Sequence, residues 1–71
     1  MEKSIKLLLG KKIKEIRQKN KLTQERLSEM ADIDYKYLQK IEGKNPPNIK
    51  IETIEKIAKA LKITPSKLLD F

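Results

Sequence analysis

Residues 22–42, LTQERLSEMADIDYKYLQKIE, decide the fold of this chain. The spacing of their apolar residues predicts two short helices that are separated by a tight turn at residues 31–34. Thr23 precedes the first helix as an N-cap, because its hydroxyl can accept a hydrogen bond from a free backbone N–H. Leu27 and Met30 give this helix one apolar side. This pattern indicates a pair of helices whose apolar sides pack against a core and whose other sides face solvent.

The second helix of the pair is predicted from about Tyr35 to Glu42. Asp32 is expected to take a left-handed conformation in the turn, and Asp34 to cap the helix that follows. Leu38 and Ile41 are spaced to face the core. Aromatic, amide and ammonium groups remain on the outer face, a mixture that suits a DNA groove: Tyr35, Lys36, Gln39 and Lys40.

Length and composition limit the classes of protein that fit. The 71 residues suffice for one small core, so we expect a single domain over residues 1–71. The sequence has no Cys and no His, which removes disulfides, thiolate metal sites and the commonest general base. It also has no phosphate-cradling glycine loop. We therefore expect no enzyme, no metal, no cofactor and no small-molecule ligand.

The longest uninterrupted apolar run covers residues 7–9, which is too short to cross a membrane. A cytoplasmic protein is expected. The net charge of +7 is unevenly placed: residues 1–21 hold 8 basic and 2 acidic side chains, residues 22–46 hold 4 and 5, and residues 47–71 hold 5 and 3. Such a basic chain suits an anionic partner, either nucleic acid or an acidic membrane. A solvated surface is an equal alternative from charge alone.

A first helix is predicted over residues 4–20, with Ser4 as its cap. Gly10 is expected to weaken it by about 1 kcal/mol relative to Ala. Its lysines would also suit a helix lying on a membrane, but Glu15 and the neighbouring helices favour packing against protein. Its apolar residues recur at helical spacing: Ile5, Leu8, Leu9, Ile13 and Ile16.

Two more helices are predicted after a proline-containing loop at residues 44–48. One begins near Ile51, and Thr64 with Pro65 starts a last short helix over residues 66–71. The sequence thus predicts an all-α domain of five helices. The buried stripe of the fourth helix is expected to contain Ile51, Ile54, Ile57, Ala58 and Leu61.

Over about residues 8–69, the order of residues resembles the Cro/C1-type (Xre family) helix-turn-helix DNA-binding domains. Phage lambda repressor and the small controller proteins of restriction–modification systems belong to this family. The matching segments are Leu22-Thr23-Gln24-Glu25, Tyr37-Leu38, Ile41-Glu42 and Ile57-Ala58-Lys59-Ala60-Leu61. The resemblance implies a five-helix lambda-repressor-like bundle whose helix-turn-helix unit covers about residues 23–42. It also implies a transcriptional regulator that binds a pseudo-palindromic operator in double-stranded DNA as a homodimer.

The resemblance implies roles for individual residues. Base readout is expected from Tyr35, Lys36, Gln39 and Lys40, and phosphate contacts from Gln24, Tyr37, Lys44 and Asn45, with Lys11 or Lys12 added from the basic first helix. For Tyr37, plain packing is an equal alternative, and Gln24 is also simply a good helix former. Arg17 and Glu42 match a structural ion pair. Leu69 and Phe71 are expected to make dimer contacts; the alternative is that they close the core of their own chain.

Three positions depart from the family pattern. Lys21 and Asp32 stand where glycines are usual, and Asn20 is expected to help at the first of these sites. Asp34 replaces the usual Ser or Thr and brings a carboxylate close to DNA, where it can accept from cytosine N4 or repel a misplaced phosphate.

A rival function is a protein-interaction module, such as an antitoxin, which the weakly charged central segment favours.

Overall fold

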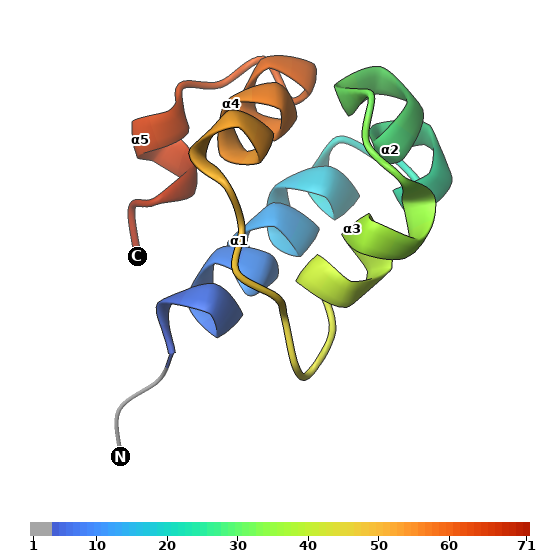
Figure 1. Cartoon of the computed structure of the whole chain (residues 1–71). Coiled ribbons are helices and arrows are strands. Elements are labelled where there is room, and N and C mark those ends of the chain that lie inside the picture. Colours follow the sequence, from blue (N-terminus) through green and yellow to red (C-terminus); the bar gives the residue numbers. More distant parts are fainter. Residues whose placement is uncertain (1–3) are drawn as a thin grey trace.

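The computed structural model describes residues 4–71, and the chain in this part is all-helical, with no strand (Figure 1). This confirms the predicted fold class. The elements are α1 (Ile5–Lys19), α2 (Gln24–Ala31), α3 (Tyr35–Ile41), α4 (Ile51–Ala60) and α5 (Pro65–Leu68).

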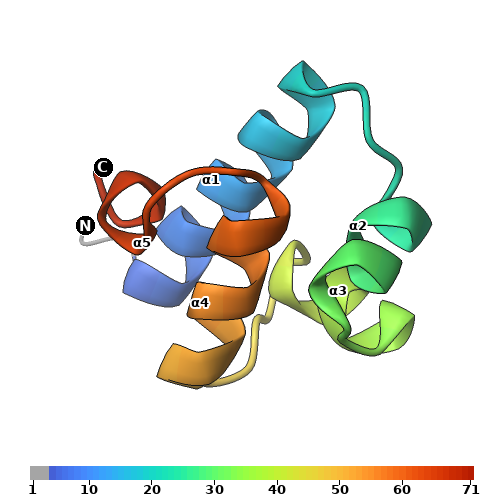
Figure 2. The same cartoon turned by 90° about the horizontal axis from the view of Figure 1, so that it is seen from above.

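The helices surround one core. Helix α2 packs against both α3 and α4, α4 packs against α5, and α1 contacts α3 and α5. The two views in Figures 1 and 2 place the α2–α3 pair on one side of the molecule and α5 on the other. The outer face of α3 is therefore left uncovered by the other helices.

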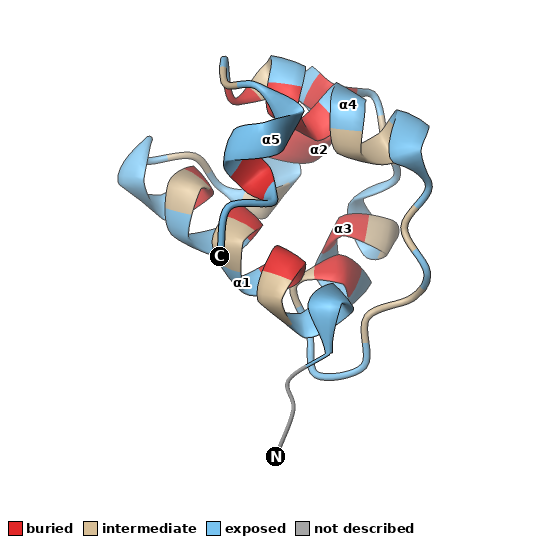
Figure 3. Ribbon diagram, turned by 90° about the vertical axis from the view of Figure 1, so that its left-hand side faces the viewer, coloured by how far each residue is buried: buried red, intermediate tan, exposed pale blue. Residues whose placement is uncertain are grey.

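Buried residues lie on the inward sides of the helices (Figure 3). Leu9 and Ile13 of α1 meet Leu38 and Ile41 of α3 in the same apolar cluster. At about 25 cal/mol per Å² of buried apolar area, such a cluster is the main stabilising contribution to a domain of this size. Its members are Leu9, Ile13, Leu27, Ala31, Leu38, Ile41, Ile57, Ala58, Leu61 and Leu68.

Three apolar residues that were expected to face the core are exposed instead. Ile5 is 68% exposed, Ile51 84% and Met30 39%. Ile5 and Ile51 are the first residues of α1 and α4, and side chains in a first turn point back beyond the helix end, where no neighbouring helix covers them. In α2 the inward position falls to Ala31, four residues after Leu27, and not to Met30.

Local signals set most helix starts. Ser4, Thr23 and Thr64 each accept a backbone hydrogen bond, at 3.2, 3.0 and 3.3 Å respectively. Pro65 opens α5 as predicted, but α5 ends at Leu68, earlier than the expected end at residue 71. Asp34 precedes α3 with extended backbone, yet its side chain makes no capping hydrogen bond. Asp34 therefore occupies the expected N-cap position, but its carboxylate does not cap the helix.

Gly10 is required where we expected a weakness. It is buried in α1, and a Cβ at this position would overlap the carbonyl oxygen of Ile41 in α3. The α1 and α3 backbones thus approach each other at a point that only glycine allows.

Three non-glycine residues take left-handed backbone. Asp32 does so with φ 56°, as predicted for the turn. After α1 the left-handed residue is Lys21, with φ 57°, while Asn20 keeps φ −87°. Asn20 is the C-cap residue of α1, where its N–H donates to the Ile16 carbonyl at 3.0 Å, so it helps at this site without being left-handed itself. Lys62, with φ 60°, is a third such residue after α4.

Candidate nucleic-acid interface

The turn between α2 and α3 is held by backbone hydrogen bonds. The left-handed Asp32 donates its N–H to the Glu29 carbonyl at 3.2 Å, and Ile33 donates to the Ser28 carbonyl at 3.0 Å. Ile33 then packs partly into the core. These contacts end α2 and fix the direction in which α3 leaves the turn.

A buried ionic cluster fastens the same unit to α1. Arg17 donates from Nε and Nη2 to the two carboxylate oxygens of Glu42, at 2.9 and 3.0 Å, and from Nη1 to the Leu22 carbonyl at 2.7 Å. Gln24, the first residue of α2, donates from Nε2 to Glu42 Oε1 at 3.0 Å. The side chains of Arg17 and Glu42 are 10% and 2% exposed. Residues from α1, the start of α2 and the end of α3 are thus joined through one carboxylate.

The outer face of α3 is open to solvent. Leu38 and Ile41 are buried, whereas the four residues predicted to read bases are exposed. The geometry therefore brings together an aromatic hydroxyl, an amide and two ammonium groups on one accessible helix face: Tyr35, Lys36, Gln39 and Lys40.

The residues predicted to contact phosphate divide into two groups. Lys44 and Asn45 are exposed in the segment after α3. Gln24 is half-buried, with its amide group already bonded to Glu42. Tyr37 is also half-buried; its ring packs on the core, and its hydroxyl donates to the Asn48 carbonyl at 3.4 Å. The Tyr37 ring thus packs against the core, as the alternative expectation had it, and a phosphate contact of its hydroxyl stays a prediction.

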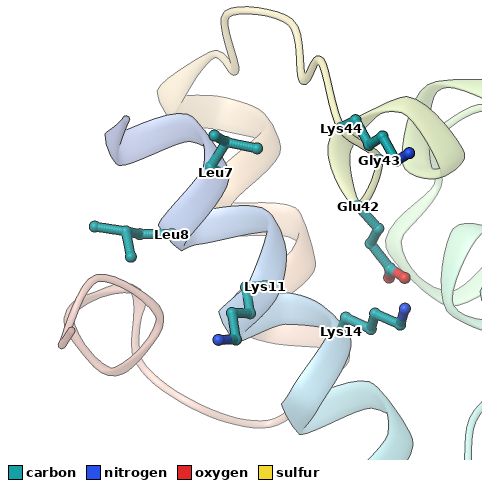
Figure 4. A pocket seen from close by; sticks show the side chains of 7 residues that line it. All are labelled: Leu7, Leu8, Lys11, Lys14, Glu42, Gly43 and Lys44. Atoms are coloured by element: carbon teal, nitrogen blue, oxygen red, sulfur yellow. The ribbon is translucent and has the colours of Figure 1, made fainter. Parts of the chain in front are cut away.

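A hollow of about 440 Å³ lies between α1 and the turn after α3 (Figure 4). Of the two α1 lysines predicted to contact phosphate, only Lys11 lines it; Lys12 is half-buried and lines a different hollow, beside Asp70 and Phe71. The hollow is lined by Leu7, Leu8, Lys11, Lys14, Glu42, Gly43 and Lys44.

Lys14 is a lining residue that the sequence reasoning missed. A signal for it was available, because Lys14 precedes Arg17 by three residues and such neighbours share one side of a helix. Since Arg17 was expected to meet Glu42, the same side of α1 had to approach the end of α3.

The two predicted dimer residues lie on the surface of the chain. Leu69 is 45% exposed and Phe71 52%, while their neighbour Leu68 is fully buried. Neither residue belongs to the buried core of the chain, and their dimer contacts stay a prediction. Asp34, which was expected near DNA, is exposed just before α3.

Within residues 4–71, no three acidic side chains gather closely enough to hold a metal ion. In the same part of the chain, no helix has both the length and the apolar character needed to cross a membrane.

A helix-turn-helix domain model matches residues 10–70. The chain belongs to the helix-turn-helix domain family. A curated relative in this family is the control protein C.BamHI from Bacillus amyloliquefaciens, which is 40% identical over 72 residues, covering 100% of this chain and 88% of the relative. The predicted resemblance to helix-turn-helix domains and to controller proteins is thus confirmed.

Solved structures of helix-turn-helix proteins share the fold. The restriction–modification controller protein C.AhdI from Aeromonas hydrophila superposes with a TM-score of 0.84 at 30% identity, over 89% of this chain and 94% of that one. The biofilm master regulator SinR, solved in complex with DNA, gives a TM-score of 0.82 at 31% identity, over 87% of this chain and 98% of that one.

Proposed function

We propose that this protein is a sequence-specific, double-stranded DNA-binding transcriptional regulator, in which α3 lies in the major groove and α2 crosses the backbone. The observation that carries this proposal is the exposed polar face of α3, held rigidly to α1 and α2 by the Arg17–Glu42–Gln24 cluster. The relatives support it, since C.BamHI is a control protein and SinR was solved with DNA.

Base readout falls to the exposed side chains of α3. A lysine such as Lys36 or Lys40 can donate to guanine O6 and N7, and Gln39 can pair with adenine N6 and N7. Tyr35 can contact a thymine methyl or donate to a phosphate. Asp34, at the entrance to α3, adds a carboxylate that accepts from cytosine N4 or rejects a misplaced strand.

Phosphate contacts position α3 in the groove without reading sequence. Gln24 and the free N–H groups at the start of α2 hold one backbone segment, and Lys44 with Asn45 holds another. Lys11 is an additional cation on α1, and the Tyr37 hydroxyl reaches a phosphate only by leaving the Asn48 carbonyl. Lys12 is not included, because, unlike Lys11, it does not line the hollow beside Lys44.

A homodimer fits this role, because two recognition helices read two half-sites about 34 Å apart on a pseudo-palindromic operator. The exposed Leu69 and Phe71 supply apolar surface for the dimer.

We propose that residues 1–71 form one domain, with its helix-turn-helix unit at about residues 23–42. The protein is a regulator and not an enzyme, and it works in the cytoplasm, where it meets DNA.

One rival function is a protein-interaction module, such as an antitoxin whose main partner is another protein. The same exposed Leu69 and Phe71 favour it, because an apolar surface can also bind a different chain.

In vitro selection from random duplex DNA tests the proposal. Enrichment of an inverted repeat would support sequence-specific binding by a symmetric dimer. If no sequence is enriched and the protein instead purifies with a stoichiometric protein partner, the interaction module replaces the regulator.

A further inference from the structure

The hollow between α1 and the turn after α3 borders the surface that we propose faces DNA. Glu42 lines this hollow and also accepts the hydrogen bond of Gln24, the first residue of α2. The start of α2 and the hollow are therefore neighbours through one shared carboxylate. Figure 4 shows that the ammonium ends of Lys14 and Lys44 point to the same side as this carboxylate, whereas Lys11 points the other way.

Lys14 and Lys44 are exposed ammonium groups on the two walls of this hollow. Within residues 4–71, the ion pairs closer than 4.0 Å are Arg17 with Glu42 and Arg26 with Glu29, so neither lysine has an acidic partner in this part of the chain. The charge of the Glu42 carboxylate is already balanced by the guanidinium of Arg17, which donates two hydrogen bonds to it. Because Arg17 balances the one carboxylate that lines this hollow, the two exposed ammonium groups leave a net positive charge there, which favours an anion.

The walls of the hollow strengthen this attraction. Leu7 and Leu8 are its apolar lining residues, and the carbon stems of the lysines add apolar surface. Where an apolar surface displaces water, a charge pair is screened less than it is in bulk solvent. An anion seated here would therefore meet both ammonium groups at a lower effective dielectric constant than at an open surface.

We infer that this hollow seats a backbone phosphate of duplex DNA between Lys14 of α1 and Lys44 of the following loop, an inference that rests on the proposed DNA-binding function. Lys14 is then the principal α1 contact, in place of Lys12 and ahead of Lys11. The contact is independent of sequence, because a phosphate carries no base information. It fastens α1 to the strand that α2 also meets through Gln24.

Lys12 provides a matched control for Lys14. The two residues lie on the same helix and carry the same charge, but Lys12 lines the hollow beside Glu15 and Asp70. Lys14→Gln and Lys12→Gln therefore change the net charge equally and differ only in place. Both positions lie away from the buried core, so thermal unfolding midpoints close to that of the wild type would verify that the variants fold.

The experiment measures binding to a mixed-sequence duplex of about 20 base pairs, two helical turns, by fluorescence anisotropy. Salt is varied from about 50 to 200 mM, because each phosphate contact contributes about 0.9 to the log–log slope. For Lys14→Gln we expect the slope to fall by about 0.9, and the affinity to drop roughly five- to tenfold near 0.1 M salt, for each subunit that is bound to the duplex. For Lys12→Gln we expect a change within about twofold, since a distant charge is screened at this salt. Lys14→Arg should keep wild-type affinity.

The outcomes separate the inference from the function on which it rests. If the wild type binds with a steep salt dependence and the two glutamine variants behave alike, the seat at Lys14 is wrong while the DNA-binding function stands. If the wild type binds no duplex even at about 50 mM salt, where backbone contacts are strongest, the proposed function fails and the inference fails with it.

Discussion

Gln24, at the start of α2, donates a hydrogen bond to Glu42, at the end of α3, with 3.0 Å between Nε2 and Oε1. The same carboxylate receives two hydrogen bonds from Arg17 of α1. Glu42 thus fixes the ends of the helix-turn-helix unit relative to the rest of the domain. This connection explains how a short helix such as α3 can present its outer face with a defined orientation.

Removing Glu42 should strand the buried Arg17 charge. For Glu42→Ala we expect the free energy of unfolding to fall by about 3–5 kcal/mol, as measured by urea denaturation. The double variant Arg17→Met with Glu42→Leu should regain much of this loss, because it buries no unpaired charge. A double variant no more stable than Glu42→Ala would show that stranded charge is not the cause.

Gly10→Ala should destabilise the protein although alanine is the better helix former. The added Cβ overlaps the Ile41 carbonyl oxygen, so α1 and α3 must move apart. We expect a loss of about 1–3 kcal/mol in the free energy of unfolding, typical of overpacking. Gln18→Ala, at an exposed position of the same helix, serves as the control and should stay within about 0.5 kcal/mol of the wild type. A stabilised Gly10→Ala variant would contradict the close approach.

Lys62→Gly should stabilise the protein. Lys62 holds φ 60°, a conformation that disfavours side chains with a Cβ and is open to glycine. We expect a gain of about 0.5–1 kcal/mol, which is the relief of left-handed strain less the added freedom of the unfolded chain. The same substitution at Lys56, in the exposed interior of α4, should instead lose about 1 kcal/mol. Equal effects at both positions would refute the assignment of strain to Lys62.

Phe71→Glu combined with Leu69→Glu should dissociate the proposed homodimer. Both side chains are about half exposed, so the fold of each chain should survive the change while the dimer dissociation constant rises at least about tenfold. Sedimentation equilibrium measures this constant. Ile51→Glu is the control, because Ile51 is an equally apolar exposed residue on α4. If Ile51→Glu dissociates the dimer and the double variant does not, the interface lies elsewhere.

Features of the fold that depend on neighbouring residues in the chain could be predicted from the sequence. The caps at Ser4, Thr23 and Thr64 and the left-handed Asp32 are such local features, and the structure has them. The roles of Gly10 and Ile51 depend instead on distant segments: one on the approach of Ile41, the other on where the adjacent helices end. No local pattern encodes these distances.

The candidate site divides in the same way. The exposed face of α3 follows from the helical spacing of Leu38 and Ile41, so its four polar residues could be named in advance. The directions of Lys11 and Lys12 could not, because no local pattern says which neighbouring helix each of them meets, whereas Lys14 shares one side of the helix with Arg17. That information comes from the packing of α1 against α3 and α5.

The proposed interface divides its roles: α3 reads bases, while the segment after it holds phosphate. The measurement that tests this most directly is the ratio of affinities for a selected inverted repeat and a random duplex, compared between the wild type, Lys40→Ala and Lys44→Ala. For Lys40→Ala we predict a loss of about 1–3 kcal/mol of discrimination, and for Lys44→Ala a weaker affinity on both duplexes with the ratio preserved. An unchanged ratio in Lys40→Ala, with both variants weakened uniformly on the two duplexes, would contradict the claim.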